Sequence, residues 1–161
     1  MEKVKAECLK RSQDRLKEDD ILVLPYDIAD FAKNDEAFKK ILDKMGNIDI
    51  LIPNAARAYL AEAADDDFAS VQQVLAVNYF SHLYLTKIVL KHWLANQLKG
   101  QILVTSAVAA NLDFIAFTSQ YTASKKMLNC FFRDVAMQHQ KNGITVTTCL
   151  PGETQWNSIR S

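Results

Sequence analysis

Short apolar runs alternate along the chain with longer segments in which apolar residues recur at a helical period. Four runs have the length of buried strands, at residues 21–26, 48–52, 101–106 and 144–149. The longer segments predict four helices, at residues 2–17, 31–45, 65–98 and 119–140. Because the strands alternate with helices, the pattern indicates βαβ units and a parallel sheet that is covered on both faces. We therefore predict a three-layer α/β fold.

Glycines and acidic residues mark where these helices begin and end. Gly46, Gly100 and Gly143 each follow a predicted helix, and glycine readily adopts the left-handed conformation that ends helices. Asp65–Asp67 suit the start of the segment 65–98, because negative charge stabilises a helix N-terminus. We expect this long segment to form either two helices or one bent helix.

Composition limits the kinds of protein that this chain can be. It has 161 residues, of which 49% are hydrophobic, with 19 basic and 19 acidic side chains. This length and apolar content suit a single domain, residues 1–161, with a sizeable core. The balanced charge does not indicate a basic face, so we expect no nucleic-acid partner. No run reaches the roughly 18 apolar residues of a membrane span, and the charged start Met1–Lys5 is unlike a signal peptide.

The cysteines and histidines do not have the spacing of a metal site. The cysteines are Cys8, Cys130 and Cys149, and none forms a CxxC pair. The histidines, which share no ligand spacing with acidic residues, are His82, His92 and His139. We therefore expect no metal and an intracellular, reducing compartment, with Cys130 and Cys149 as small core residues within apolar runs.

The strongest candidate for chemistry is a serine at a strand end, followed by a tyrosine and a lysine in a helix. Ser106 closes the run 101–106, and Tyr121 and Lys125 lie four residues apart in the segment 119–140. Residues at this spacing share a helix face, and a nearby cation lowers the pKa of a tyrosine. Tyr121 would then donate a proton while Ser106 bonds a substrate oxygen, which suits carbonyl reduction or alcohol oxidation. The alternative is a loop serine and a chance pair on a solvated helix.

Further polar or turn-forming residues come at the ends of the predicted strands. These strand-end residues are Asp27, Asn54, Ser106 and Pro151-Gly152. In an open parallel sheet, ligands bind beyond the carboxyl ends of the strands. Each residue alone would be an ordinary turn residue, but the four positions together favour a binding site.

The order of these motifs resembles the short-chain dehydrogenase/reductase family over nearly the whole chain. In chain order the motifs are Asp27 after Ile21–Tyr26, Pro53-Asn54-Ala55-Ala56, Val77-Asn78-Tyr79, Ser106, Tyr121-Thr122-Ala123-Ser124-Lys125 and Leu150-Pro151-Gly152. The resemblance implies a Rossmann-like parallel sheet and an NAD(P)-dependent oxidoreductase that interconverts a carbonyl and an alcohol. It begins after the family's first βαβ unit and stops before the family's C-terminal strand.

The resemblance implies a role for each catalytic candidate. Ser106 positions and polarises the substrate carbonyl, and Tyr121 donates or accepts the proton. Lys125 lowers the pKa of Tyr121 and bonds the nicotinamide ribose. Asn78 is the fourth member and holds a water that relays protons toward the lysine; the alternative for Asn78 is an exposed polar position on a helix.

The resemblance also implies a cofactor and its contacts. Asp27 accepts a hydrogen bond from the adenine amine, and Asn54 and Ala55 line the adenine ribose. The residues expected near the nicotinamide and its ribose are Tyr121, Lys125, Pro151, Gly152 and Thr154. The cofactor is NAD or NADP, and the segments Val4–Leu9 and Leu85–Leu90 resemble a branch of the family that slightly favours NADP.

The partners that the resemblance implies are a small-molecule carbonyl or alcohol substrate and a second copy of the chain. A homo-oligomer would form through the helices 65–98 and 119–140. A cytoplasmic location and an association with the endoplasmic reticulum membrane in full-length relatives are both compatible with the resemblance.

Three departures from the family pattern bear on function. The four glycines form no glycine-rich turn of the kind that cradles a pyrophosphate at a helix N-terminus. Where the family has Asn-Asn-Ala-Gly, this chain has Pro53-Asn54-Ala55-Ala56. Pro53 removes a backbone donor, and Ala56 adds a methyl group in place of the glycine. The segment between Ser106 and Tyr121 is longer than usual, which leaves Thr105 or a loop residue as an alternative to Ser106. We therefore expect the 161-residue chain alone to bind a dinucleotide poorly and to be nearly inactive.

Three hypotheses remain open on the sequence. The first is an oxidoreductase whose chain lacks both ends. The second is a non-catalytic binding or scaffold remnant of the fold that has lost dinucleotide binding, and the third is the product of a wrong gene model. An in-frame strand and glycine-rich turn encoded upstream of Met1 would favour the first.

Overall fold

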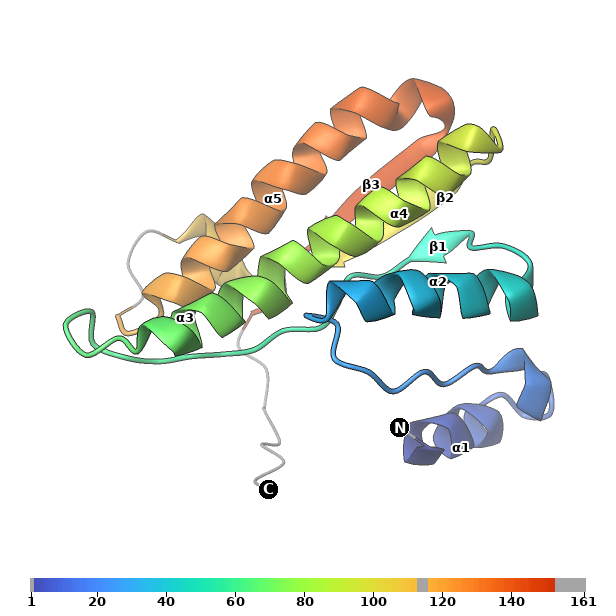
Figure 1. Cartoon of the computed structure of the whole chain (residues 1–161), viewed down its shortest axis with the longest axis horizontal. Helices are drawn as coiled ribbons and strands as arrows, with labels where there is room; N and C mark the ends of the chain where they lie inside the picture. The colour runs from blue at the N-terminus through green and yellow to red at the C-terminus, as the bar shows by residue number, and fades with distance from the viewer. Residues whose placement is uncertain (1, 113–115, 153–161) are drawn as a thin grey trace. The chain divides into compact units, whose positions relative to one another are not determined.

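The computed structural model describes residues 2–112 and 116–152. The chain forms two compact units, Met1–Asn47 and Ile48–Ser161 (Figure 1).

The first unit contains two helices and a short 3₁₀ turn. Helix α1 (Glu2–Arg11) is followed by η1 (Glu18–Asp20) and by helix α2 (Phe31–Met45). The bounds of α2 match the prediction, because the Asp30 side chain accepts from the Lys33 N–H at its start and Gly46, at φ 80°, ends it. Helix α1 ends earlier than predicted, before Gln13 and Asp14, which both have positive φ.

The predicted strand at 21–26 is wrong. Its side chains are half-buried at 21–24, and Ile21 has an extended backbone (φ −123°, ψ 115°), as its apolar sequence suggests. However, a strand requires a hydrogen-bonded neighbour, and no segment of the described residues pairs with this one.

The second unit is built on a parallel sheet of three strands among the described residues. Strands β1 (Ile50–Leu51), β2 (Gly100–Thr105) and β3 (Ile144–Cys149) lie in the order β1-β2-β3. The β2–β3 register runs from Gly100 opposite Ile144 to Thr105 opposite Cys149, and Ile50 lies opposite Gln101. The parallel α/β fold is therefore confirmed, with three of the four predicted strands present.

The helices of this unit pack on the sheet and on one another (Figure 1). Helix α3 (Phe68–Leu75), the π-helical turn η2 (Ala76–Phe80) and helix α4 (Ser81–Ala95) form one continuous helical segment. Helix α5 (Ser119–His139) contacts β3, α3 and η2. The short 3₁₀ turns η3 (Val108–Asn111) and η4 (Gln140–Asn142) follow β2 and α5. The predicted segment 65–98 is thus one helix interrupted by a π turn.

The core lies between β2 and the helices. Ile102, Val104, Trp93, Leu128 and Phe132 are fully buried there. The Trp93 Nε1–H also donates to the Ile48 carbonyl at 2.6 Å, which joins α4 to the chain before β1.

The cysteines lie outside this core. The prediction that Cys130 and Cys149 are core residues is wrong, because both are exposed. Cys130 lies on the outer side of α5, and β3 buries only Ile144 fully.

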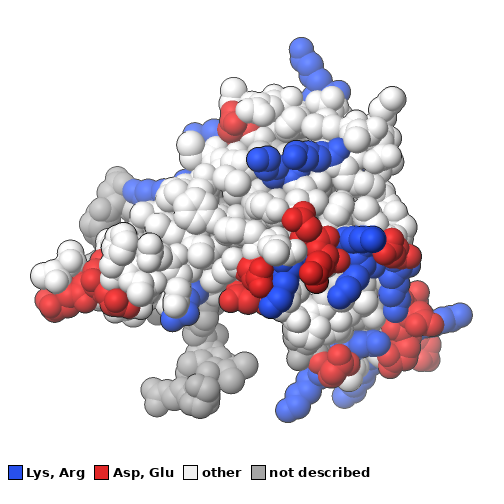
Figure 2. All heavy atoms as spheres, in the orientation of Figure 1, with Lys and Arg blue, Asp and Glu red and all other residues white. Residues whose placement is uncertain are grey.

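The surface carries mixed charge. Figure 2 shows acidic and basic side chains interspersed on the face that it draws, beside wide uncharged areas. Among the described residues, no helix is both long and apolar enough to cross a membrane.

Gly100 provides a direct test of the core packing. A Cβ added at Gly100 would lie 2.5 Å from Trp93 ring atoms, whereas one at Gly152 would meet none of the described atoms within 4 Å. We expect Gly100→Ala to lower the free energy of unfolding by roughly 2–3 kcal/mol through overpacking. Gly152→Ala is the matched control and should change it little. Urea unfolding followed by tryptophan fluorescence measures both, and equal stabilities for the two variants would contradict this packing.

Candidate active site

Ser106 lies where the chain leaves the sheet after β2. Its N–H donates to the Cys149 carbonyl at 2.9 Å, which continues the β2–β3 ladder by one residue. The side chain is buried, and its Oγ donates to the Lys125 carbonyl at 3.4 Å. The end of β2 is therefore held directly against α5.

Tyr121 and Lys125 lie in the first two turns of α5, and the predicted i, i+4 pairing is present. The Lys125 Nζ lies 5.8 Å from the centroid of the Tyr121 ring. Lys125 is only 1% exposed, and its Nζ donates to the Thr105 carbonyl at 2.9 Å. A cation is thus held between the last residue of β2 and the tyrosine ring.

The acid–base properties of the pair differ from the prediction. Burial raises the pKa of Tyr121 above its ordinary value, so the expected lowering by Lys125 is wrong in this structure. The loss of water around the ring disfavours the charged phenolate. Burial also lowers the pKa of Lys125 to about 8. At neutral pH Tyr121 therefore carries its proton, and Lys125 is mostly charged.

Asn78 lies in the π turn and is fully buried, so the alternative of an exposed polar position is wrong. Its Oδ1 accepts from the Arg57 N–H at 2.7 Å, and its Nδ2 donates to the Arg57 carbonyl at 3.0 Å. The same Nδ2 donates to the Ser124 Oγ at 3.0 Å. These contacts make the side chain an anchor; its role in holding a relay water stays a prediction.

Ser124 connects the π turn to the tyrosine. This fully buried residue accepts from Asn78 and donates through its Oγ to the Tyr121 carbonyl at 2.6 Å. Sequence reasoning passed over Ser124, although its i+3 spacing from Tyr121 places both residues on one side of the helix. The site therefore contains two hydrogen-bonded networks. One joins Asn78, Ser124 and Tyr121, and the other joins Ser106, Lys125 and Thr105.

The loop after β1 carries two of the predicted cofactor contacts. The buried Pro53 accepts from the Thr105 N–H at 3.1 Å, and Asn54 and Ala55 beyond it are exposed. The Ala55 carbonyl accepts from the His82 Nε2 at 2.7 Å. Sequence reasoning considered His82 only as a metal ligand, and its i+4 spacing from Asn78 was the signal for this role.

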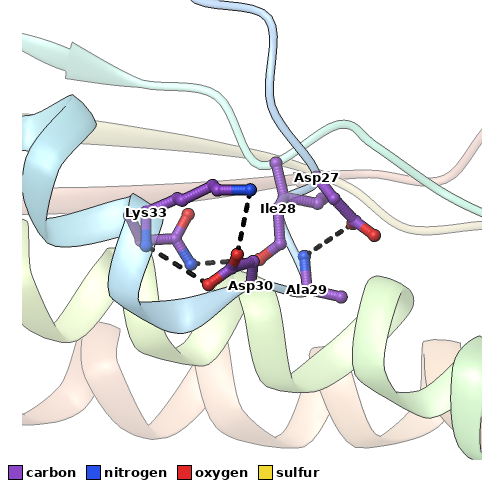
Figure 3. Close-up of polar contacts among 6 residues, drawn as sticks. Asp27, Ile28, Ala29, Asp30 and Lys33 are labelled. Carbon is purple, nitrogen blue, oxygen red and sulfur yellow. Dashed lines mark hydrogen bonds and ion pairs between the residues drawn. The ribbon is translucent and has the colours of Figure 1, made fainter.

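Asp27 belongs to the first unit, where it forms a local turn. Its Oδ1 accepts from the Ala29 N–H at 2.9 Å, and Figure 3 shows this bond beside the Asp30–Lys33 contacts that begin α2. The Ile28 carbonyl of the same turn accepts from the Asn34 Nδ2 at 3.0 Å. The turn interpretation of Asp27 therefore holds, and its contact with an adenine stays a prediction.

The segment after β3 is only partly described. The Pro151 carbonyl accepts from the Val108 N–H at 2.9 Å, which joins this segment to η3, and Gly152 is exposed. Thr154 lies outside the described residues. Within the described part of the chain, no group of three or more histidine, cysteine and acidic side chains is arranged to hold a metal.

Comparisons with known proteins agree on the kind of protein. A family model described as short chain dehydrogenase matches residues 1–160. The mouse protein named dehydrogenase/reductase SDR family member 7 is 32% identical over 162 residues, which cover 100% of this chain and 47% of the relative. The chain thus spans about half the length of the curated relatives it matches.

Solved structures share the fold. A short chain dehydrogenase from Bacillus anthracis superposes with a TM-score of 0.82 at 26% identity, covering 92% of this chain and 61% of that one. A 4-hydroxyisoleucine dehydrogenase complexed with NADH superposes with a TM-score of 0.76 at 24% identity, covering 81% and 57%. The predicted Rossmann-like fold class is therefore confirmed.

The buried amine of Lys125 predicts a pH-dependent stability. Its pKa is about 8 in the folded chain against an ordinary value of 10.5, so the unfolded state binds more protons between these values. We expect the free energy of unfolding of the wild type, relative to Lys125→Met, to rise from pH 8 to pH 10.5. Below pH 8 this difference should be constant.

Lys126→Met is the matched control, because Lys126 is the exposed neighbour on the same helix. The pH profile of Lys125→Met should therefore differ from that of Lys126→Met. Urea unfolding at half-unit pH steps makes the measurement. If Lys125→Met and Lys126→Met show the same pH profile, the Lys125 amine is not buried as described.

Proposed function

The chain belongs to the short-chain dehydrogenase family, and we propose that it carries the catalytic residues of an NAD(P)-dependent oxidoreductase that interconverts a carbonyl and an alcohol. The observation that carries this proposal is the buried Lys125 ammonium, held beside the Tyr121 ring at the end of β2. A buried cation beside a protonated phenol is an unusual arrangement for a core, and it is useful when a phenolate must form.

The two residues divide the proton transfer between them. Tyr121 holds its proton at neutral pH, so it is ready to donate to a carbonyl oxygen as that oxygen gains negative charge. The phenolate that remains is costly where water is excluded, and the Lys125 ammonium offsets this cost. In the alcohol-oxidising direction, the same ammonium favours the Tyr121 phenolate, which accepts the proton of the alcohol hydroxyl. Ser106, beside Lys125, would bond the substrate oxygen and hold it for the transfer.

The residues present fit one half of the expected cofactor. An ammonium has three N–H donors, and the Thr105 carbonyl takes one from Lys125, so a ribose diol is a suitable further partner. Bound NADH or NADPH would supply the hydride. The sequence offers Asn54, Ala55, Pro151 and Gly152 as further neighbours, but none of its four glycines forms a pyrophosphate turn.

Two local residues support a second candidate function, that of a non-catalytic binding or scaffold protein. Pro53 and Ala56 favour it, because they leave less backbone open to a close ligand. Binding and turnover separate the two candidates.

Removal of the Tyr121 hydroxyl tests the oxidoreductase. We expect Tyr121→Phe to lower kcat/KM for carbonyl reduction by about 10²–10⁴-fold, the usual contribution of a general acid. The assay uses the longest protein that the gene expresses, with NADH and NADPH in turn and a panel of small aldehydes and ketones.

Tyr79→Phe is the matched control for this assay. Tyr79 lies in the neighbouring π turn and packs its ring against Phe80 and Phe131. The same loss of a hydroxyl there should leave the rate within about twofold, because Tyr79 takes no part in the proposed chemistry. Turnover that survives Tyr121→Phe as well as it survives Tyr79→Phe would refute the proposed mechanism.

Dinucleotide titration tests the binding half. We expect the purified 161-residue chain to bind NADH and NADPH weakly, without saturation at micromolar concentrations, because a pyrophosphate requires closely approaching backbone amides. Calorimetry and nucleotide fluorescence measure this. Saturable micromolar binding would show that the chain holds a dinucleotide without a glycine-rich turn. If the longest expressed protein neither binds nor turns over, the scaffold function is favoured.

A further inference from the structure

The loop after β1 has little backbone structure of its own. Strand β1 is only Ile50–Leu51, and the bond from the Thr105 N–H to the Pro53 carbonyl is the last link of this loop to β2. Residues 52–62 then have no regular secondary structure. The next backbone–backbone bond of the loop among the described residues is from the Ala61 N–H to the Phe117 carbonyl at 3.2 Å, so side chains must define how the loop runs between Pro53 and Ala61.

Two side chains, one helical turn apart, hold this loop. Asn78 bonds both the N–H and the carbonyl of Arg57, and His82 donates from its Nε2 to the Ala55 carbonyl at 2.7 Å. Asn78 and His82 lie at i and i+4, in η2 and the first turn of α4, and both are buried. The helical segment thus binds alternate residues of the loop.

The bond to Ala55 is the one hydrogen bond that the His82 ring makes among the described residues. A carbonyl only accepts, so Nε2 carries the proton and Nδ1 is a bare acceptor in the neutral ring. His82 is 2% exposed, and its Nδ1 has no hydrogen-bond partner among the described residues. Burial, with a smaller contribution from the charge of Lys125, lowers the pKa of His82 and keeps the ring neutral. A buried imidazole with an unsatisfied nitrogen is costly, so the bond to Ala55 is its evident use.

We propose that His82 is a positioning residue, which fixes the loop 53–57 through the Ala55 carbonyl and so sets the surface that the dinucleotide meets at Asn54 and Ala55. The effect on the dinucleotide rests on the proposed function. The effect on the loop 53–57 does not, so the two effects are tested separately.

Three substitutions at His82 distinguish the position of the N–H donor from the mere presence of a polar side chain. His82→Gln keeps an N–H donor that extends to about the position of Nε2, whereas His82→Asn carries the same amide one methylene shorter. His82→Leu removes the donor. Thr86→Val is the matched control, because Thr86 lies one turn further along the same buried face and its Oγ1 also has no partner among the described residues.

Hydrogen–deuterium exchange of the peptide covering residues 53–60 is the first measurement. The Arg57 N–H is its informative amide, since Asn78 accepts from it. We expect exchange in His82→Leu and His82→Asn to be about three- to tenfold faster than in the wild type, the loss of one hydrogen bond's worth of protection. His82→Gln should restore most of the protection, and Thr86→Val should leave it unchanged. If His82→Leu does not fold, the Gln and Asn variants still make the comparison.

The anchor is refuted if His82→Asn exchanges as slowly as His82→Gln, or if Thr86→Val exchanges as fast as the His82 variants. The second measurement is kinetic and uses the longest protein that the gene expresses. There His82→Asn should raise KM for the dinucleotide about three- to tenfold with kcat nearly unchanged, and His82→Gln should recover the lower KM. An unchanged KM with faster exchange would overturn the link to the cofactor. An inactive wild type would count against the proposed function and leave the exchange result to decide the anchor.

Discussion

The amine of Lys125 lies in the interior of the second unit and donates to the carbonyl of Thr105. Moving an ammonium out of water is costly, and the lowering of its pKa to about 8 reflects that cost. Thr105 is a suitable partner because the sheet holds it on both sides: its N–H donates to Pro53, and it pairs in register with Cys149. The parallel sheet therefore fixes the acceptor, the acceptor fixes the lysine, and the lysine lies beside the Tyr121 ring.

The second constraint is the π turn in the long helical segment. In η2 the Ser81 N–H donates to the Ala76 carbonyl, five residues back, so the helix widens at Asn78. From this turn the buried Asn78 bonds Arg57 in the loop after β1 and Ser124 in α5. Such turns occur frequently at functional sites. Here the turn places one amide between two segments that are far apart in sequence.

Much of the fold could be predicted because its signals are local. The end of α2 follows from Gly46, and β2 and β3 follow from short apolar runs. The strand predicted at 21–26 was wrong because pairing is not local: an apolar run cannot indicate whether a neighbour is present. Cys130 and Cys149 were placed in the core for the same reason, since an apolar run does not show which side of an element is covered.

The candidate site, like the fold, could be predicted only in part. The types and order of Ser106, Tyr121 and Lys125 pointed to the chemistry, and the structure brings Lys125 against both of the others. The direction of the Tyr121 pKa shift could not be predicted, because it depends on how much water the fold removes from the ring. Ser124 and His82 were missed because their spacing from Tyr121 and Asn78 indicates only a shared helix side. Their importance comes from single hydrogen bonds to the Tyr121 and Ala55 carbonyls, which spacing alone does not specify.

The two buried basic groups of the site are compatible only because one of them is neutral. His82 feels the charge of Lys125, and a protonated ring would place a second cation in the same interior, at a further cost in desolvation. As a neutral donor, His82 holds the Ala55 carbonyl without adding charge, which a lysine or arginine at that position could not do. The positive charge there consequently remains on Lys125, beside the ring of the one tyrosine whose phenolate the proposed chemistry requires.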